Sequence, residues 1–328
     1  MTSQKTFQRL VSESKRSVTS DAVVPSVIQA AGPVAKRRFV EFFTANIRNA
    51  NTRESYLRAV RFFCDWCSDL SIPLLSVEPT IVAAYVEGLR ARYADGSVKV
   101  HLAAIRMLFD YLTTGGVIPF NPATAVKGPK LIVTKGKTPV LSASDARQLI
   151  DSIDTSTVIG LRDRALIATM VYSFARIGAT LKMNVDDVWL NGRRYWVRLH
   201  EKGGRYHEMP LHHSAEQFLL EYLTAANRFD ATGIPLFCTV GRRKELTERR
   251  MHRNDGLRMV KRRAIQAGVS PLVCCHTFRA TGITEYMRNG GTLEKAQQMA
   301  AHSSSKTTNM YNRVNDLVSL DEVERIQI

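Results

Sequence analysis

The stretch HTFRATGITEYMRNGGTLEKAQQMAAHSSSKTTNMY, residues 276–311, begins with a histidine and ends with a tyrosine. His276 and Arg279 stand three residues apart, so they share one face where a helix starts. His302 precedes Tyr311 by nine residues, in a segment that holds one lysine, Lys306, and no acid. Taken alone, such a segment is typical of a surface turn that leads into a short helix. Cationic residues elsewhere in the chain favour a functional interpretation.

Two such residues lie before this stretch, each at the expected end of a structural element. Arg176, in VYSFARIGATL, follows an apolar helical run. Lys202, in EKGGRYHEMPL, falls at the expected tip of a β-hairpin. An isolated arginine or lysine is usually a solvated surface group, so the order and spacing of the whole set carry the argument.

Charge is the most informative bulk property of this chain. It has 46 Lys and Arg against 30 Asp and Glu, a net charge of +16 and a pI near 9.9. Such an excess indicates a polyanionic partner, most often nucleic acid. An anionic membrane surface is the alternative, but the sequence shows no basic amphipathic helix with a face rich in Trp and Phe. We therefore expect a nucleic acid as the partner and no membrane.

Length and composition indicate a folded protein of two domains. The 328 residues allow two cores, and 45% hydrophobic with 23% charged residues is ordinary for a globular chain. The longest apolar run, Ala165 to Ala175, is too short to span a bilayer. The polar N-terminus lacks the apolar core of a secretory signal. With five cysteines, an odd number, and no export signal, we expect reduced thiols inside a cell. Together with a nucleic-acid partner, this predicts a cytoplasmic, nucleoid-associated protein.

The sequence pattern divides the chain into four parts. Residues 1–35 show no sustained period, and we predict a weakly structured segment. Residues 36–118 are predicted to form a helical domain, and residues 119–140, rich in Pro, Gly and Lys, a basic interdomain linker. Residues 141–328 are predicted to form a second domain with a C-terminal segment over 317–328. The fold class is mainly α, with a second domain that is mixed α/β but mostly helical.

Two helices define the first domain. In NTRESYLRAVRFFCDWC, Asn51 is the expected cap, with Glu54 reaching back to it. The expected inward face of this helix is Leu57, Val60, Phe63, Cys64 and Cys67. On that face the Cys64–Cys67 pair is interpreted as buried apolar residues rather than a metal site. The second helix has the expected inward residues Leu102, Ile105, Leu108, Phe109 and Leu112, and Gly115 and Gly116 end it.

The second domain is expected to begin with a helix over 145–153 that Ser142 and Ser144 cap. A β-hairpin over 193–211 then interrupts the helices. Its strands show alternation at Tyr195, Val197 and Leu199, and the Gly203–Gly204 pair turns the chain.

In this order and at these spacings, the cationic residues resemble the tyrosine recombinases, also called the phage integrase family. The resemblance begins near residue 40, and its most specific parts are RDRALIATMVYSFARIGATLKMNVDDV (162–188), EKGGRYHEMPL (201–211) and residues 276–311. It implies a two-domain clamp around duplex DNA, with a SAM-like helical domain that binds the core site. The residues that match the catalytic set of the family are Arg176, Lys202, His276, Arg279, His302 and Tyr311.

Three positions depart from the usual family pattern. Ser173-Phe174-Ala175 stands where Thr-Gly-x is common before the first arginine, and Ala179 replaces an acid three residues after it. Ala301 replaces the usual glycine before the second histidine. The acid normally helps to fix the first arginine. Ala179 therefore leaves Arg176 without the residue that usually sets its orientation.

The implied chemistry is transesterification at a DNA phosphate without metal, ATP or another cofactor. The guanidiniums of Arg176 and Arg279 would hold the non-bridging oxygens of the phosphate with forked hydrogen bonds. His302 would be a further donor. Tyr311 is the expected nucleophile, with His276 assisting departure of its proton, and Lys202 is the expected acid for the leaving 5′ oxygen. The resemblance also implies a homotetramer on paired DNA sites, with residues 317–328 docking on a neighbouring protomer.

Further DNA contacts are expected from basic residues outside this set. The candidates are Arg53, Arg58, Arg61, Lys99, Arg106, Arg249, Arg250, Arg258, Lys261 and Arg262. Several belong to residues 242–268, a densely basic segment whose alternative interpretation is a solvated helix face. Two other functions stay open: a type IB topoisomerase that nicks and reseals one duplex, and a non-catalytic DNA-binding regulator.

Overall fold

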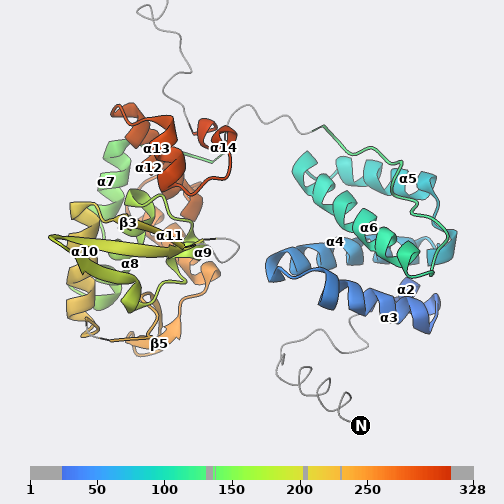
Figure 1. The fold of residues 1–328 in the computed structure, drawn as a ribbon, viewed down its shortest axis with the longest axis horizontal. Coiled ribbons are helices and arrows are strands. Elements are labelled where there is room, and N and C mark those ends of the chain that lie inside the picture. The colour runs from blue at the N-terminus through green and yellow to red at the C-terminus, as the bar shows by residue number, and fades with distance from the viewer. Residues whose placement is uncertain (1–23, 131–135, 137, 202–205, 230, 312–328) are drawn as a thin grey trace, which may run out of the picture. The chain divides into compact units, whose positions relative to one another are not determined.

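The structure is a computed structural model that describes residues 24–130, 136, 138–201, 206–229 and 231–311. The chain divides into two units, residues 1–132 and 133–328 (Figure 1). The boundary falls inside the segment that the sequence predicts to be a linker. No helix among the described residues is long and apolar enough to cross a membrane.

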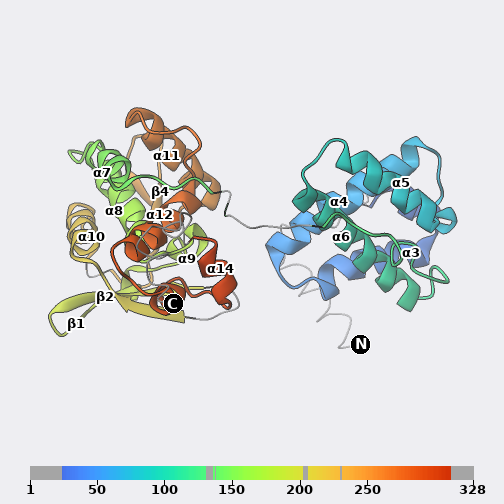
Figure 2. The ribbon, with the colours of Figure 1, turned by 90° about the horizontal axis from the view of Figure 1, so that it is seen from above.

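The N-terminal unit is helical throughout the part that the structure describes. Its elements are α2 (Ser26–Ala30), α3 (Pro33–Glu41), a π-helical turn (Phe42–Asn46), α4 (Ala50–Asp69), a 3-10 turn (Leu74–Ser76), α5 (Pro79–Arg90) and α6 (Asp95–Thr114). The long helices α4 and α6 pack on one another, and α5 packs on α6 (Figures 1 and 2). The core between them is apolar and rich in aromatic rings.

The prediction of a weakly structured segment over 1–35 is wrong for its last part. Helix α2 buries Val27 and Ile28 in the core of the unit, and α3 begins at Pro33, directly after Gly32 with a φ of 98°. A helix of five residues is too short to show a hydrophobic period, so its packing is visible only in three dimensions. Residues 1–23 lie outside the described residues.

The helix predicted around residues 51–67 is α4, and its cap differs from the expectation. The side chain of Asn49, rather than Asn51, accepts hydrogen bonds from the backbone N–H groups of Asn51 and Thr52 at 3.0 and 3.2 Å. The helix therefore starts two residues earlier, because Asn49 has the extended backbone that an N-cap needs. The inward face is confirmed at Phe63 and Cys67, and burial raises the pKa of the Cys67 thiol to about 12.

Helix α6 confirms the second predicted helix. All five residues expected to face inward are buried, namely Leu102, Ile105, Leu108, Phe109 and Leu112. The helix ends at the predicted glycine pair, where Gly116 adopts a φ of 68° that disfavours side chains with a Cβ.

The second unit combines helices with two small antiparallel sheets. Its helices are α7 (Ala143–Asp151), α8 (Val158–Tyr172), α9 (Ile177–Thr180), a 3-10 turn (Val185–Asp187), α10 (His213–Ala225), α11 (Arg253–Gln266), α12 (Cys275–Arg288), α13 (Leu293–Met299) and α14 (Ser305–Asn309). Its strands are β1 (Val188–Asn191), β2 (Arg194–His200), β3 (Tyr206–Pro210), β4 (Cys238–Val240) and β5 (Leu246–Arg250). The β1–β2–β3 sheet lies on one side of the helices, with α7 and α11 on the opposite side (Figure 2).

The predicted hairpin corresponds to β2 and β3, which pair with Val197 opposite Met209. Strand β1 adds a third strand through the Trp189–Trp196 pair, and β4 with β5 forms a further two-stranded sheet. Strands β1, β4 and β5 were not predicted from the sequence, because runs of three to five residues with mixed exposure show no clear alternation.

Helix α7 follows its predicted cap. It begins at Ala143, after the Ser142 hydroxyl accepts a hydrogen bond from the backbone N–H of Asp145 at 3.0 Å. Helix α12 packs closely on α8, and Gly282 makes that approach possible. A Cβ at Gly282 would lie 2.1 Å from the backbone oxygen of Val171 and 2.8 Å from the ring of Phe174. The glycine therefore lets α12, which carries His276 and Arg279, lie against the end of α8.

Candidate active site

Arg279 is a fully buried cation at the centre of the candidate site. One terminal nitrogen donates to the backbone carbonyl of Phe174, and the other donates to that of Ala300 at 2.5 Å. Its Nε is also buried, without a hydrogen-bond partner in the described structure. Burial, together with the charge of Arg176, lowers the pKa of Arg279 to about 10, whereas Glu201 and Tyr311 act in the opposite direction. The guanidinium stays charged at neutral pH, where a buried cation attracts an anionic group strongly.

Arg176 is the N-cap residue of α9, and its side chain is partly exposed. Its terminal nitrogen donates to Oε2 of Glu201 at 2.8 Å, and Glu201 itself is only 8% exposed. Both residues line a pocket of about 630 Å³, together with His302. The pocket thus exposes a guanidinium that an adjacent carboxylate holds in place.

His276 and Tyr311 form a direct pair. Nε2 of His276 lies 2.6 Å from the hydroxyl oxygen of Tyr311, at a ring centroid distance of 6.0 Å. Loss of hydration lowers the pKa of His276, and the charges of Arg279 and Arg176 lower it further. The imidazole is therefore neutral near pH 7 and able to accept a proton from the phenol.

Tyr311 is buried against α12. Its ring is only 6% exposed and packs in a cluster with Phe174, Ala280 and Ile283. Its backbone carbonyl accepts a hydrogen bond from the Thr284 hydroxyl at 3.2 Å. The same helix therefore holds both the phenol and the arginine beside it.

His302 completes the cluster. Its Nδ1 lies 2.8 Å from the hydroxyl of Thr308, and its ring stacks on Tyr311 at 5.9 Å between centroids. Burial lowers the pKa of His302 to about 3, with smaller contributions from Arg279, Arg176 and His276. His302 is thus a neutral imidazole in a site that already contains two cations.

Two positions that depart from the usual pattern lie in strained backbone. Phe174 has a φ of 53° and Ala301 a φ of 46°, the left-handed region that favours glycine. Both flank the carbonyl groups that Arg279 binds, since the acceptors are Phe174 and Ala300. The structure therefore keeps the backbone turn at both places although the side chains differ, at a cost of about 1–2 kcal/mol each.

Five of the six residues that the sequence predicts for catalysis lie in one cluster, and the sixth, Lys202, lies outside the described residues. Sequence reasoning missed Glu201, the partner of Arg176, and Thr308, the partner of His302. It also missed His207, which lines the pocket with a buried Nε2 that has no hydrogen-bond partner in the described structure. Among the described residues, no group of three or more His, Cys, Asp or Glu could hold a metal ion.

Three of the predicted DNA-contacting residues serve the fold through their guanidinium groups. Arg53 donates to the backbone oxygen of Ile47 at 2.8 and 3.1 Å. Arg106 donates to the backbone oxygens of Ala123, at 3.1 Å, and Val126. Arg250 donates at 2.6 and 2.8 Å to two carbonyls in the segment after α9 and at 2.6 Å to the side chain of Asn184. A spacing pattern cannot separate these arginines from solvated ones, because each acceptor lies on another element or turn.

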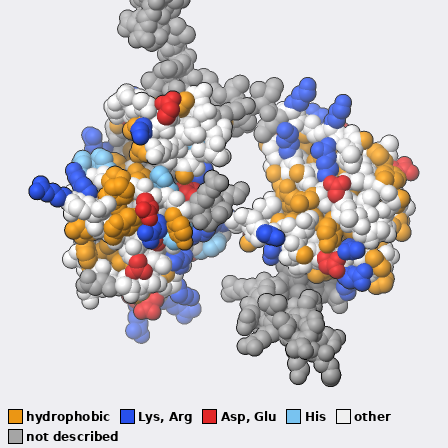
Figure 3. Space-filling model, viewed as in Figure 1, with side chains coloured by type: hydrophobic (Ala, Val, Ile, Leu, Met, Phe, Trp, Pro, Cys, Tyr) orange, Lys and Arg blue, Asp and Glu red, His pale blue; other side chains and the backbone are white. Residues whose placement is uncertain are grey.

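The remaining candidates differ in their exposure and in their partners. Arg58 and Arg258 are exposed and form ion pairs within their own helices. Lys261 donates to a backbone carbonyl at 2.6 Å, and Arg262 pairs with the buried Asp163 at 3.2 Å. Lys99 and Arg249 are exposed, and Arg61 is half-buried on α4. Figure 3 shows Lys and Arg side chains on the visible faces of both units.

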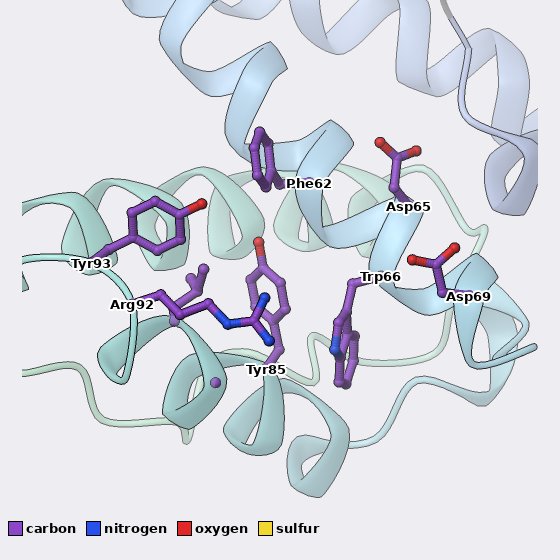
Figure 4. Close-up of a pocket in the computed structure, with 9 residues that line it drawn as sticks. Phe62, Asp65, Trp66, Asp69, Tyr85, Arg92 and Tyr93 are labelled. Carbon is purple, nitrogen blue, oxygen red and sulfur yellow. The ribbon is translucent and has the colours of Figure 1, made fainter.

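A separate hollow of about 320 Å³ lies in the N-terminal unit, between α4 and α5. Figure 4 shows Trp66 and Tyr85 facing it, with the Arg92 side chain extending across it and Asp65 and Asp69 along α4. None of the residues predicted for catalysis lines this hollow.

The cluster of predicted catalytic residues lies within a region that matches a known family. The profile of the Phage integrase family covers residues 139–317, more than half of the 328-residue chain. The chain belongs to the phage integrase family. The profile of the phage integrase N-terminal SAM-like domain covers residues 38–116.

Relatives of this integrase-family chain are tyrosine recombinases. It is 28% identical over 282 residues to the tyrosine recombinase XerD of Listeria monocytogenes. The aligned region covers 82% of this chain and 90% of that relative. The chain is 29% identical over 251 residues to the tyrosine recombinase XerC of Myxococcus xanthus, which covers 75% and 80%.

Solved structures share the fold. The XerH site-specific recombinase, in a post-cleavage complex with its palindromic difH substrate, matches with a TM-score of 0.69 at 17% identity. That match covers 89% of this chain and 82% of the other. A lambda integrase dimer bound to a COC′ core site matches with a TM-score of 0.66 at 16% identity, over 92% and 82% of the two chains.

Proposed function

We propose that this chain is a site-specific DNA recombinase that cleaves and rejoins strands through a covalent 3′-phosphotyrosyl bond on Tyr311. The observation that carries the proposal is the pairing of the Tyr311 hydroxyl with Nε2 of His276 at 2.6 Å, beside the buried guanidinium of Arg279. A phenol with a pKa of about 10 is protonated at neutral pH, so it needs a base and a cationic surrounding to react. Both are present around this tyrosine.

The phosphate would be held by Arg176 and Arg279. Attack on the phosphorus spreads negative charge over the non-bridging oxygens, and guanidiniums bind such oxygens with paired, charge-assisted hydrogen bonds. Among the described residues, the buried Nε–H of Arg279 has no hydrogen-bond partner, and Arg176 opens onto the pocket. Each preorganised donor of this kind is worth roughly 3–4 kcal/mol of barrier lowering.

In the proposed transesterification, every bond and proton is accounted for without metal or ATP. The Tyr311 oxygen forms a bond to phosphorus while the bond from phosphorus to the 5′ oxygen breaks. The phenolic proton passes to the neutral His276, and the leaving oxygen takes a proton from Lys202. The 3′-phosphotyrosyl ester keeps the bond energy, so the 5′-hydroxyl of another strand reverses the step and completes exchange.

His302 would serve as a neutral donor to the phosphate. Nδ1 of His302 lies 2.8 Å from the Thr308 hydroxyl, and in the tautomer in which Nδ1 accepts this hydrogen bond the ring carries its proton on Nε2. A donor that is neutral avoids further repulsion in a site that already holds Arg176 and Arg279.

Double-stranded DNA is the proposed partner, bound by both units. We propose exchange within a homotetramer on paired sites, which residues 317–328 would link by docking on a neighbouring protomer. Those residues lie outside the described residues. A lambda integrase tetramer bound to a Holliday junction has a related fold, with a TM-score of 0.65 at 17% identity.

The function is tested with a library of nicked duplexes of random sequence. The nick lies just 3′ of the cleaved phosphate, so that cleavage releases a short 5′-hydroxyl fragment and traps the covalent complex. Wild-type protein is expected to retain a DNA subset after denaturation, whereas Tyr311→Phe, which keeps the ring and removes the hydroxyl, retains none. Adducts of equal yield in both proteins would contradict the proposed nucleophile.

Recovered sequences then provide two-site plasmids. Recombinant products support strand exchange between duplexes. Relaxation of supercoils without any exchanged product would instead identify a type IB topoisomerase, and DNA binding without any adduct would identify a non-catalytic regulator.

A further inference from the structure

The pocket beside Arg176 contains one carboxylate among the described residues that line it. That carboxylate is Glu201, at the end of β2, and its Oε2 accepts from the terminal nitrogen of Arg176 at 2.8 Å. Glu201 is 8% exposed, while the Arg176 side chain is 41% exposed. A buried carboxylate is stable only with a close donor, so this geometry favours one orientation of the guanidinium.

The backbone around Arg176 is fixed independently of Glu201. Its carbonyl oxygen accepts from the N–H groups of Ala179 and Thr180 at 2.8 and 3.0 Å, which starts α9. The long side chain still needs a partner to select a single rotamer. Glu201 supplies that partner through one terminal nitrogen and leaves the other donors of the guanidinium for a ligand in the pocket.

Glu201 also balances the charges that face it. The groups around it are Arg176, Arg279 and His207, two cations and an imidazole whose pKa burial lowers. The charge of Glu201 raises the pKa of Arg279, whereas the charge of Arg176 lowers it. A single carboxylate therefore keeps two guanidiniums compatible at one small site before any phosphate arrives.

We propose that Glu201 is the positioning residue for Arg176 and holds its guanidinium toward the scissile phosphate. In this chain position 179 is an alanine, so the carboxylate comes from a strand end 25 residues after the arginine rather than from the same helix turn. The inference rests on the proposed function, in which Arg176 binds the phosphate.

The test compares Glu201→Gln with wild-type protein on a nicked duplex recovered from the library. Glutamine keeps the size of the side chain and removes its charge. Single-turnover cleavage is expected to fall at least tenfold, while the affinity for DNA changes less than twofold. Glu201→Asp, which keeps the charge, is expected to lose less than Glu201→Gln. Glu208→Gln is the matched control, because Glu208 lies on β3 and pairs with Arg198 at 2.7 Å away from the pocket lining.

The decisive readout uses the same duplex with a methylphosphonate at the cleaved position. Replacing one charged oxygen by methyl reduces the need for a positioned guanidinium, so the loss in Glu201→Gln is expected to shrink to less than threefold. An equal loss on both substrates would indicate a general structural defect and overturn the inference. Undiminished phosphodiester cleavage by Glu201→Gln would also overturn it. Failure of the wild-type protein to form an adduct would instead contradict the proposed function.

Discussion

The two units of this chain differ in the polarity of the residues that they bury. In the described part of the N-terminal unit every buried core residue is hydrophobic, and the arginines lie at its periphery. All the polar and charged residues that are buried among the described residues belong to the second unit, including Arg279, Glu201 and His302. Burying such groups costs stability unless each is paired. In the second unit, Arg279, Glu201 and His302 belong to the site of the proposed chemistry, which depends on preorganised cations.

Because of this contrast, arginine hydrogen bonds have different roles in the two units. Arg106 and Arg53 of the N-terminal unit bind carbonyls that end local turns, so they support an apolar fold. Arg279 also binds carbonyls, but it is surrounded by Tyr311, Arg176 and Glu201. The same type of hydrogen bond thus stabilises a turn in one unit and aims a cation in the other.

The largest expected effect comes from removing the buried cation. Arg279→Ala should lower single-turnover cleavage by about 10³-fold, because the transition state loses a fixed donor in a water-poor site. DNA binding at the same salt concentration should change little, because Arg279 would supply only one of the many phosphate contacts that a DNA-binding surface makes. Arg288→Ala, which removes an exposed arginine of α12 that pairs with Glu285, is the control and should cleave normally. Near-normal cleavage by Arg279→Ala would remove the distinction between buried and surface arginines.

The next effect concerns the pH dependence of stability. The pKa of His302 is lowered to about 3 in the folded state, whereas an unfolded histidine titrates near 6.5. As the pH falls below about 6.5, the unfolded state therefore binds a proton that the folded state does not. Stability should fall by up to about 1.4 kcal/mol per pH unit from this group alone.

Urea unfolding at pH 7 and pH 5 measures this effect in a Trp66→Phe background, in which the remaining Trp189 and Trp196 report only on the second unit. His302→Gln should lose less stability than its parent over this interval. Equal losses in both proteins would show that His302 is not the buried neutral group that distinguishes this unit.

The smallest effects separate two cations on α6. Arg106→Ala should destabilise the N-terminal unit by about 1–3 kcal/mol, because two carbonyls lose their donor. Lys99→Ala should leave stability within about 0.5 kcal/mol. It should instead reduce the slope of log affinity against log salt by about one. Trp66 fluorescence in a Trp189→Phe, Trp196→Phe background measures the first quantity, and DNA titrations at several salt concentrations measure the second. A Lys99→Ala protein with an unchanged salt slope would remove Lys99 from the DNA-binding surface.

Local spacing was sufficient for the parts of the fold and site that depend on one element. The inward face of α6 and the Ser142 cap were predicted correctly, because each depends on neighbours within a few residues. His276 and Arg279 likewise lie on one helix start, and the structure brings them to Tyr311.

The rest depends on contacts between distant segments. Glu201 meets Arg176 across 25 residues, and a buried partner such as Glu201 leaves no periodic signal. Arg250 looked like a surface cation because its acceptors, the carbonyls of Leu181 and Met183, lie on another segment. Helix α2 was missed because five residues cannot establish a period.

The position of the covalent bond tests the central claim most directly. Protein trapped on a recovered nicked duplex is digested with nuclease and protease, and the nucleotide-linked peptide is sequenced by mass spectrometry. The account predicts a 3′-phosphate attached to the oxygen of Tyr311. Attachment to another side chain, or through a 5′-phosphate, would contradict it.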